Sequence, residues 1–387
     1  MENRTGLFTN IAIWFGVAIS VSEILAGVQI ASAAPTDSIW IPLILGHVIG
    51  GILLFFVGLI GARLRVNAME SIKSTFGSYG SKFFAFLNVM QLIAWVAVLN
   101  AQGAQALMGL NLQISYPATC FILAILVAMW VFVGLKRSSK ITSAVMIVLT
   151  MLLILLTLQL SGLKAFSPVH ISNQTLTFWN IFEVSIAMPI SWLPVISDYT
   201  KDVKKPVSTT ALSAAAYTVA SLWMYFIGVE VVSIGTTDIA RAILISGLGV
   251  QGVIIMVLST VTTNFLATNS AGESAKAIFK RLDPKITGVI VSILSAVIAI
   301  SGIMDHYISF LYLISSVFAP MAAVLLVSFY IGCENKKRDW YWNIFAWFVG
   351  FIVYQITSSL DSVILGPTLI AVIVSAALTY IWIKVNN

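Results

Sequence analysis

The residues from Phe178 to Thr200 read FWNIFEVSIAMPISWLPVISDYT, and this stretch indicates an interrupted membrane helix. Pro189 and Pro194 fall in its middle, with Ser191 between them. Proline lacks a backbone donor and clashes with the preceding turn, so it breaks or kinks a helix. Backbone groups freed within a membrane survive only where they line a cavity or bind something. The stretch therefore predicts a broken span with a binding site beside it; a plain kink at Pro189 is the alternative.

The composition is that of a polytopic membrane protein. The chain has 387 residues, of which 59% are hydrophobic and 9% are charged, whereas soluble domains carry about 25% charged residues. Apolar runs of about 20 residues, each long enough to cross a bilayer as a helix, recur along it. We expect about twelve spans, at residues 10–31, 39–61, 83–108, 117–134, 141–160, 176–197, 210–233, 244–268, 286–303, 306–332, 340–357 and 363–384.

The lysines and arginines support this number of spans. With the N-terminus in the cytoplasm, all but two of the 21 basic residues fall in cytoplasmic loops, and only Lys164 and Arg241 fall outside. Such a bias sets the orientation of membrane proteins. It predicts a multi-pass protein of a bacterial inner membrane with both termini cytoplasmic, and it explains the basic composition without nucleic-acid binding.

The first span, IWFGVAISVSEILAGVQIA, also has polar residues at its centre, namely Ser20, Ser22 and Glu23. Polar groups at this depth are costly and mark functional sites; a hydrogen-bonded structural carboxylate is the alternative for Glu23. Interruptions in spans one and six, five spans apart, predict two repeats of opposite orientation. We therefore expect an all-α membrane fold with a 5+5 inverted repeat, broken helices 1 and 6, and two C-terminal helices. The single domain, 1–387, would contain repeats at 10–160 and 176–332 and additional helices at 340–384.

Hydroxyl groups cluster in the eighth span, within the segment LSTVTTN. Ser259, Thr262 and Thr263 are spaced i, i+3 and i+4, which places them on one helical face. Together with carbonyls of an unwound neighbouring helix, they would form a neutral oxygen cage that suits an alkali cation. The alternative is that each hydroxyl bonds to the carbonyl four residues earlier in its own helix.

Span three carries Gln91 and Trp95 on one face. An indole beside an amide favours a flat heteroaromatic ligand; a packing tryptophan and an inter-helix amide bond are the alternative. His47 is predicted to be a satisfied interior histidine. The sequence contains no metal-ligand spacing, phosphate-binding loop or nucleophile–base pair, so an enzyme is not expected.

Three segments, AISVSEILAG (18–27), SWLPVISDYTK (191–201) and STVTTN (259–264), resemble the nucleobase–cation symporters that include cytosine permeases. The similarity is greatest to the branch of hydroxymethylpyrimidine (thiamine-precursor) transporters. It implies import of a small pyrimidine by symport with a cation, with Na+ as the expected ion, through alternating access. It implies no cofactor besides that ion and no nucleic-acid or obligate protein partner, with lipid as the only other neighbour.

The resemblance also implies site residues. The substrate would be bound by Ile19, Ser20, Ser22, Glu23, Gln91, Trp95, Met188, Pro189, Ser191, Trp192, Asn264, Thr268 and Asn269. The Na+ ion would be held by Ser259, Thr262 and Thr263, and by the backbone carbonyls of Phe15 and Ala18.

Several departures from the family pattern leave the substrate open. Pro189 stands where the permeases have an aromatic residue, and Ala267 and Asn269 stand where the hydroxymethylpyrimidine branch has an acidic residue and a tyrosine. A permease for cytosine, another nucleobase or a hydantoin-like ring, with proton coupling instead of Na+, is the alternative. Glu23 is then a candidate to accept from an exocyclic amine or to carry a coupling proton.

Overall fold

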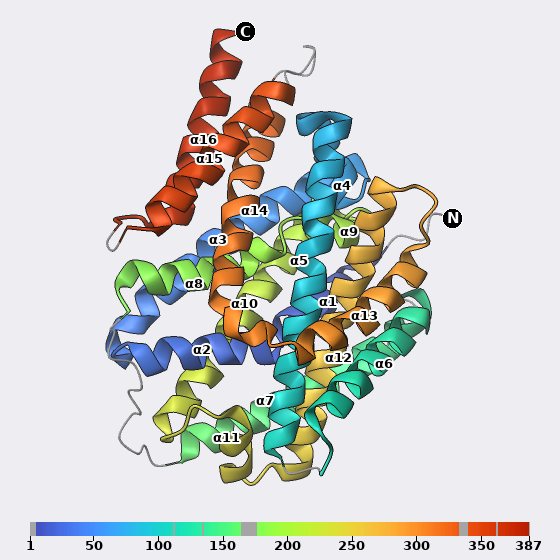
Figure 1. Ribbon diagram of the computed structural model, residues 1–387, viewed down its shortest axis with the longest axis vertical. Helices are drawn as coiled ribbons and strands as arrows, with labels where there is room; N and C mark the ends of the chain where they lie inside the picture. The colour runs from blue at the N-terminus through green and yellow to red at the C-terminus, as the bar shows by residue number, and fades with distance from the viewer. Residues whose placement is uncertain are drawn as a thin grey trace.

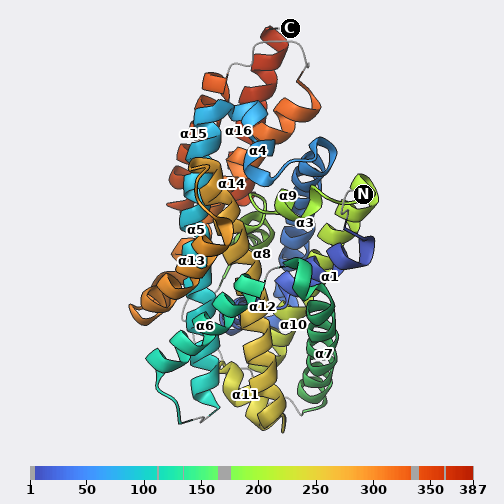
Figure 2. The same ribbon diagram turned by 90° about the vertical axis from the view of Figure 1, so that its right-hand side faces the viewer.

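The computed structural model describes residues 5–110, 113–133, 135–163, 176–332, 340–360 and 363–386, with only the backbone for 135–143. Lys164, one of the two basic residues predicted to lie outside, is not among them. The described chain is helical apart from loops and one isolated bridge between Thr5 and Val203. That bridge holds the N-terminus beside the loop that follows α9 (Figure 2).

The first half of the chain begins with two short helices and continues with long ones, apart from the four-residue α4 (Figure 1). Its helices are α1 (Leu7–Ala18), α2 (Val21–Ala33), α3 (Thr36–Leu64), α4 (Ala68–Ser71), α5 (Lys73–Gly109), α6 (Tyr116–Val133) and α7 (Leu135–Gly162). The second half repeats this order with α8 (Phe178–Ser191), α9 (Ile196–Thr200), α10 (Pro206–Ser233), α11 (Ile239–Ile245), α12 (Gly249–Ile278), α13 (Pro284–Ile300), η1 (Ile303–His306) and α14 (Tyr307–Tyr330). The last two helices are α15 (Trp340–Ser358) and α16 (Gly366–Val385).

Each predicted span has a counterpart among these helices. In the described residues, eight helices are long and apolar enough to cross a membrane, and the bent pair α1–α2 makes nine. The other three predicted spans correspond to α8–α9, to the 17-residue α13 and to α15. The predicted all-α fold with two interrupted helices is confirmed.

Two predicted spans differ from the observed helices by ten residues at one end. Span three starts at Lys73 instead of residue 83, and span eight runs from Gly249 to Ile278 instead of from 244 to 268. Hydropathy ends a span where polar residues begin, but the polar end of α12 stays helical because Ser270 and Ser274 are buried against neighbouring helices. The predicted start of this span, at residue 244, falls before the turn between α11 and α12, where Gly247 has a φ of 77°.

The first interruption separates α1 from α2, whose axes differ by 47°. Ile19 and Ser20 leave the helical conformation, and the Ser20 hydroxyl accepts a hydrogen bond from the Glu23 amide at 3.3 Å. Serine is a preferred N-cap residue because its side chain satisfies an amide that has no helical acceptor. The break therefore follows from a local signal, a serine that starts a new helix.

The second interruption lies between α8 and α9. Pro189 remains inside α8, and the helix ends two residues later at Ser191. Tight turns from Trp192 to Val195, which include Pro194, then lead into α9. The break thus falls at the second proline of the quoted stretch.

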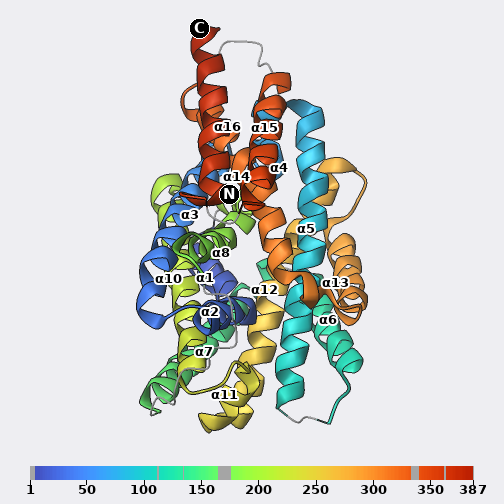
Figure 3. The same ribbon diagram turned by 60° about the vertical axis from the view of Figure 1, so that its left-hand side comes forward.

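The helices form two groups that meet along α12. In Figure 3, α1, α2, α3, α8 and α10 lie together on one side, and α5, α6, α12 and α13 lie on the other. Contacts between α1 and α12, and between α2 and α5, connect the groups. Helices α15 and α16 pack outside them, against α14. Both interrupted helices therefore belong to one group and face the other.

A buried carboxylate connects α8 to the last helix. Glu183 accepts hydrogen bonds from the Thr368 amide at 2.8 Å and from the Thr368 hydroxyl at 2.6 Å. We expect Thr368→Val to lower the free energy of unfolding by about 1–3 kcal/mol, since it removes one hydrogen-bond partner of a buried carboxyl group. The thermal unfolding midpoint of purified protein measures this loss.

Thr379→Val is the matched control, because this second buried threonine of α16 donates only to Ser375 of its own helix. Equal decreases in the two variants would show that the bond between Glu183 and Thr368 contributes nothing specific.

Candidate functional site

Helix α12 meets the first interruption through Thr263. The Thr263 hydroxyl donates to the carbonyl of Ile19 at 3.4 Å, and both residues are buried. The carbonyl lies in the non-helical link between α1 and α2. One of the three predicted cation-binding side chains therefore contacts the backbone of the break.

The other predicted cation ligands differ from Thr263 in their partners. The Ser259 hydroxyl is buried and has no hydrogen-bond partner among the described residues. The Thr262 hydroxyl bonds back to Leu258 at 2.7 Å, as the alternative interpretation expected. The carbonyls of Phe15 and Ala18 accept from the amides of the break, at 3.3 and 3.0 Å, and the carbonyl to which Thr263 donates is that of Ile19.

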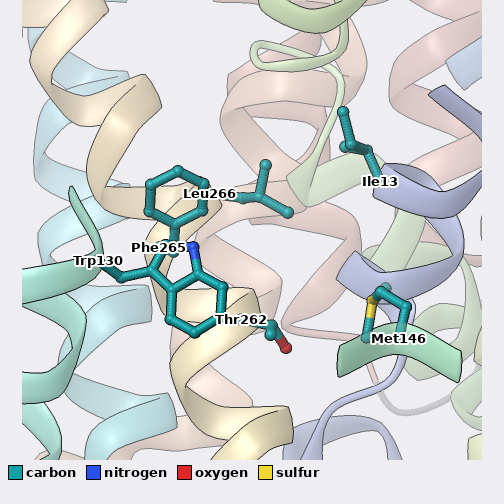
Figure 4. Close-up of a pocket in the computed structure, with 7 residues that line it drawn as sticks. Ile13, Trp130, Met146, Thr262, Phe265 and Leu266 are labelled. Atoms are coloured by element: carbon teal, nitrogen blue, oxygen red, sulfur yellow. The ribbon is translucent and has the colours of Figure 1, made fainter. Parts of the chain in front are cut away.

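Thr262 instead faces a small cavity between α1, α6, α7 and α12 (Figure 4). It is the only hydroxyl-bearing residue of that lining, which comprises Ile13, Gly16, Trp130, Met146, Thr262, Phe265 and Leu266. Thr262 and Thr263 thus lie next to each other in sequence, but Thr262 lines an apolar cavity and Thr263 contacts the break.

Gln91 connects α5 to the second interruption. Its side-chain amide donates to the Ser191 carbonyl at 3.1 Å and to Asn88 at 2.8 Å. Its Oε1 atom is buried and has no partner within the described chain. A buried acceptor without a donor costs free energy, so it points to a ligand that supplies one.

Trp95 lies one turn further along α5, with 6% of its surface exposed. Its ring packs edge-on against Tyr307 and Phe310, with centroids 6.3 and 5.4 Å apart. The indole N–H is buried and has no partner in the part of the chain that the structure describes. Gln91 and Trp95 therefore offer an acceptor and a donor, with aromatic surface beside them.

Ser22 faces α5 from the other side of the break. Its hydroxyl donates to Gln102, and its carbonyl accepts from the Tyr307 hydroxyl at 3.3 Å. Gln102 and Tyr307 were not predicted as site residues. In the sequence, Tyr307 reads as one more aromatic residue of span ten, so no pattern pointed to it.

The sequence also did not predict a cluster of aromatic side chains that includes Trp192 of the second break. Trp14 is fully buried and packs edge-on against Trp192, Tyr199 and Tyr217, at 6.0 to 6.1 Å. Asn269 reaches the same cluster, donating to the Tyr199 hydroxyl at 3.4 Å. Of these residues, only Trp192 and Asn269 were predicted. In the sequence, Trp14 reads as one more apolar residue of a span.

Of three further predicted residues, two have local side-chain partners and one has a free acceptor. The Ser191 hydroxyl donates to the Met188 carbonyl at 2.6 Å, and the Thr268 hydroxyl donates to the Asn264 carbonyl at 2.8 Å. The Asn264 side-chain oxygen is buried without a partner among the residues described. Asn264 therefore resembles Gln91 in having a free acceptor, whereas the hydroxyls of Ser191 and Thr268 bond within their own helices.

Glu23 is turned toward α10. Its two carboxylate oxygens accept from the Tyr217 hydroxyl at 3.1 Å and from the Ser221 hydroxyl at 2.8 Å. This is the hydrogen-bonded carboxylate that sequence reasoning offered as the alternative to substrate contact. His47 is confirmed as a buried histidine with partners on both ring nitrogens, Ser185 at 2.6 Å and Ser221 at 2.7 Å.

Two interrupted helices side by side, with unpartnered polar groups around the breaks, are the arrangement of secondary transporters. The chain belongs to the family described as permeases for cytosine/purines, uracil, thiamine and allantoin, whose model matches residues 1–341. It is a multi-pass membrane permease and not an enzyme, and the resemblance to nucleobase–cation symporters is confirmed at the level of the family.

Solved structures show the same fold. The inward-facing conformation of Mhp1 is similar with a TM-score of 0.77 and 20% identity, over 99% of this chain and 91% of that one. Mhp1, a nucleobase-cation-symport-1 family transporter, in a closed conformation with bromovinylhydantoin bound, gives 0.75 and 20%, over 100% and 94%. A Na+-coupled sialic acid symporter gives 0.74 and 13%, over 99% and 90%. No curated protein sequence matches the chain.

Proposed function

We propose that the protein imports hydroxymethylpyrimidine, or a pyrimidine closely related to it, by symport with Na+. The observation that carries this proposal is a group of buried polar atoms on α5 and α12 that have no partner in the described residues: Gln91 Oε1, Trp95 Nε1, Asn264 Oδ1 and Ser259 Oγ. Native proteins leave few such groups, and each one needs an explanation. A polar ring and a cation would supply the missing partners.

The substrate would bind between α5, α12 and the breaks. Gln91 Oε1 is free to accept from a ring N–H or an exocyclic amine, and the Trp95 indole N–H is free to donate to a ring nitrogen. Because the Gln91 amide also holds the Ser191 carbonyl, substrate bound to Gln91 would be coupled to the second break. Aminopyrimidines offer donors and acceptors on one flat ring, which suits this site.

The cation would bind where α12 meets the first break. Ser259 and Thr263 would supply hydroxyl oxygens, and the end of α1 with the link that follows it, Phe15 to Ile19, would supply carbonyls. In the described residues no group of three or more His, Cys, Asp or Glu could hold a metal ion, so hard neutral oxygens are the donors at hand. Na+ bound there would steady the break and improve the substrate site, which is the basis of coupling.

Alternating access would follow from movement of one helix group against the other. With both termini in the cytoplasm, as the basic residues predict, α11 would lie on the outer side. Binding at the breaks, where the two groups meet, would favour the conformation in which both sets of contacts are made.

A second candidate substrate is a hydantoin-like ring or cytosine. It is favoured by the likeness to Mhp1 with bromovinylhydantoin bound, and by Ala267 and Asn269, which depart from the hydroxymethylpyrimidine pattern. Competition among hydroxymethylpyrimidine, cytosine, uracil and a hydantoin for binding to the purified protein separates these substrates.

Calorimetric binding of hydroxymethylpyrimidine, with and without Na+, tests the proposal. We expect Na+ to lower the dissociation constant by about tenfold, which corresponds to about 1.4 kcal/mol of coupling. Thr263→Ala should abolish this gain and leave Na+-free binding unchanged, because the hydroxyl that contacts the Ile19 carbonyl is lost.

Thr260→Ala is the matched control. Thr260 is also buried in α12, but it faces Gly103 of α5 instead of the break, so this variant should keep the response to Na+. If the affinity of the wild-type protein for hydroxymethylpyrimidine were the same with and without Na+, Na+ would not be the coupling ion. If hydroxymethylpyrimidine did not bind but another ring did, the proposed substrate would be wrong.

A further inference from the structure

Four helices share one chain of buried polar side chains away from the proposed substrate contacts. Starting from Glu23 on α2, the chain passes through Ser221 on α10 at 2.8 Å and His47 on α3 at 2.7 Å. It continues to Ser185 on α8 at 2.6 Å and ends at the Leu43 carbonyl at 2.5 Å. All four side chains are at most 2% exposed. The chain therefore joins the helices that carry both interruptions, α2 and α8, to α3 and α10.

The surroundings of this chain hold no described basic residue to balance a carboxylate. On α10, Tyr217 donates to Glu23, and Tyr225 packs its ring edge-on against His47, with centroids 4.8 Å apart. On α14, Tyr307 bonds to the carbonyl of Ser22, next to Glu23. Helices α5 and α12 contribute only neutral amides and hydroxyls here.

Two other carboxylates near these helices, the buried Glu183 and the partly buried Asp198, have partners elsewhere. Glu183 on α8 accepts from Thr368, and Asp198 on α9 accepts from the Ala68 amide at 2.9 Å. The charge of this row of hydrogen-bonded side chains therefore depends on Glu23 and His47 alone.

The hydrogen bonds among these side chains are complete in two protonation states, which differ by one proton. With one proton fewer, the Glu23 carboxylate accepts from Ser221, Ser221 accepts from His47 Nε2–H, and His47 Nδ1 accepts from Ser185. With one proton more, both ring nitrogens of His47 carry hydrogen, or Glu23 is protonated and donates to Ser221. Ser185 then accepts from His47 Nδ1–H and donates to Leu43. Both states satisfy every side chain, which a buried polar network requires to be stable.

We propose that Glu23, Ser221 and His47 form a proton-binding site that holds one exchangeable proton between α2, α3, α8 and α10. The extra proton moves along the chain without leaving a side chain unpaired, because Ser221 can donate in either direction. Adding it turns the Ser185 hydroxyl from His47 to the Leu43 carbonyl, and so changes the bond between α8 and α3. Protonation would thereby act on the helix that carries the second interruption. Nothing in this site requires the identity of the transported ring.

Infrared difference spectra of the purified protein, recorded across a pH titration without substrate or Na+, test the site. We expect bands of a protonated carboxyl group and of the His47 ring, assigned by isotope labelling of histidine, to titrate together. Glu23→Gln should remove the carboxyl band, and His47→Gln should move its midpoint by about one pH unit or more, as for strongly interacting groups.

Glu183→Gln is the control, since it removes a buried carboxylate that is not part of the chain. This variant should leave the coupled bands unchanged, and a cooperative thermal unfolding transition in every variant verifies folding. A Glu23 group that keeps one protonation state across the titration, or one that titrates alike with and without His47, would overturn the proposal. Because no substrate is added, failure of the pyrimidine or Na+ proposals would not affect this result.

Discussion

Gln91→Leu should weaken binding of the transported ring by about 10- to 100-fold, equivalent to about 1.4–2.8 kcal/mol, while the protein remains folded. The buried Gln91 Oε1 atom has no donor within the described chain, and leucine of similar size cannot supply an acceptor there. The substitution also removes the donor to the Ser191 carbonyl, so the second break loses its link to α5. A site that hydrogen-bonds its ligand loses much of its affinity when one partner is removed.

The affinity for hydroxymethylpyrimidine measured by calorimetry gives this effect directly. Gln105→Leu serves as the control, because Gln105 lies on the same helix and is exposed beside α11. Unchanged affinity in Gln91→Leu, or an equal decrease in both variants, would exclude Gln91 from the substrate site.

Gly228→Val should prevent stable folding, with an expected cost of more than about 3 kcal/mol. A Cβ atom at Gly228 would lie 2.2 Å from the Ile24 carbonyl oxygen and 2.7 Å from the Val28 nitrogen of α2. A Cβ atom at Gly27 of α2 would likewise lie 2.4 Å from the Tyr225 carbonyl oxygen of α10. The backbones of α2 and α10 are in contact here, and membrane helices that pack through small residues have no space for a side chain between them. A valine at position 228 would therefore have to displace α2.

The yield of monodisperse protein after extraction, and its thermal unfolding, measure the loss. Gly249→Val is the control, since nothing lies within 4 Å of a Cβ atom at that position. A Gly228→Val variant with wild-type yield and stability would show that the close approach of α2 and α10 is not required.

Much of the fold was readable because membrane helices obey a simple rule. Backbone groups must be satisfied within the helix and side chains must be apolar, so a span is visible as a run of hydrophobic residues. The breaks were visible as well, because Ser20 and Pro194 act on their own neighbours in the chain. The extra length of α5 and α12 was missed since packing between helices, and not hydropathy, keeps those ends helical.

The candidate site was readable only in part. Thr263 and Gln91 were identified by spacing and by resemblance, and the structure places each beside a break. Thr262 belongs to the same spacing pattern as Thr263, yet it bonds to Leu258 and faces an apolar cavity. Trp14 and Tyr307 contact predicted site residues, but they come from spans in which an aromatic residue carries no signal.

The sequence by itself determined that this chain crosses the membrane many times, that its first and sixth spans are broken, and that polar residues gather near the breaks. These properties depend on local backbone chemistry and on the cost of polar groups in lipid. Only the tertiary structure decided where each polar group points. Glu23 and His47 lie in different helices, and Ser221 joins them because α2, α3 and α10 pack at distances that no local pattern encodes. A hydrogen bond requires two atoms within about 3 Å, and across helices that condition is met by packing alone.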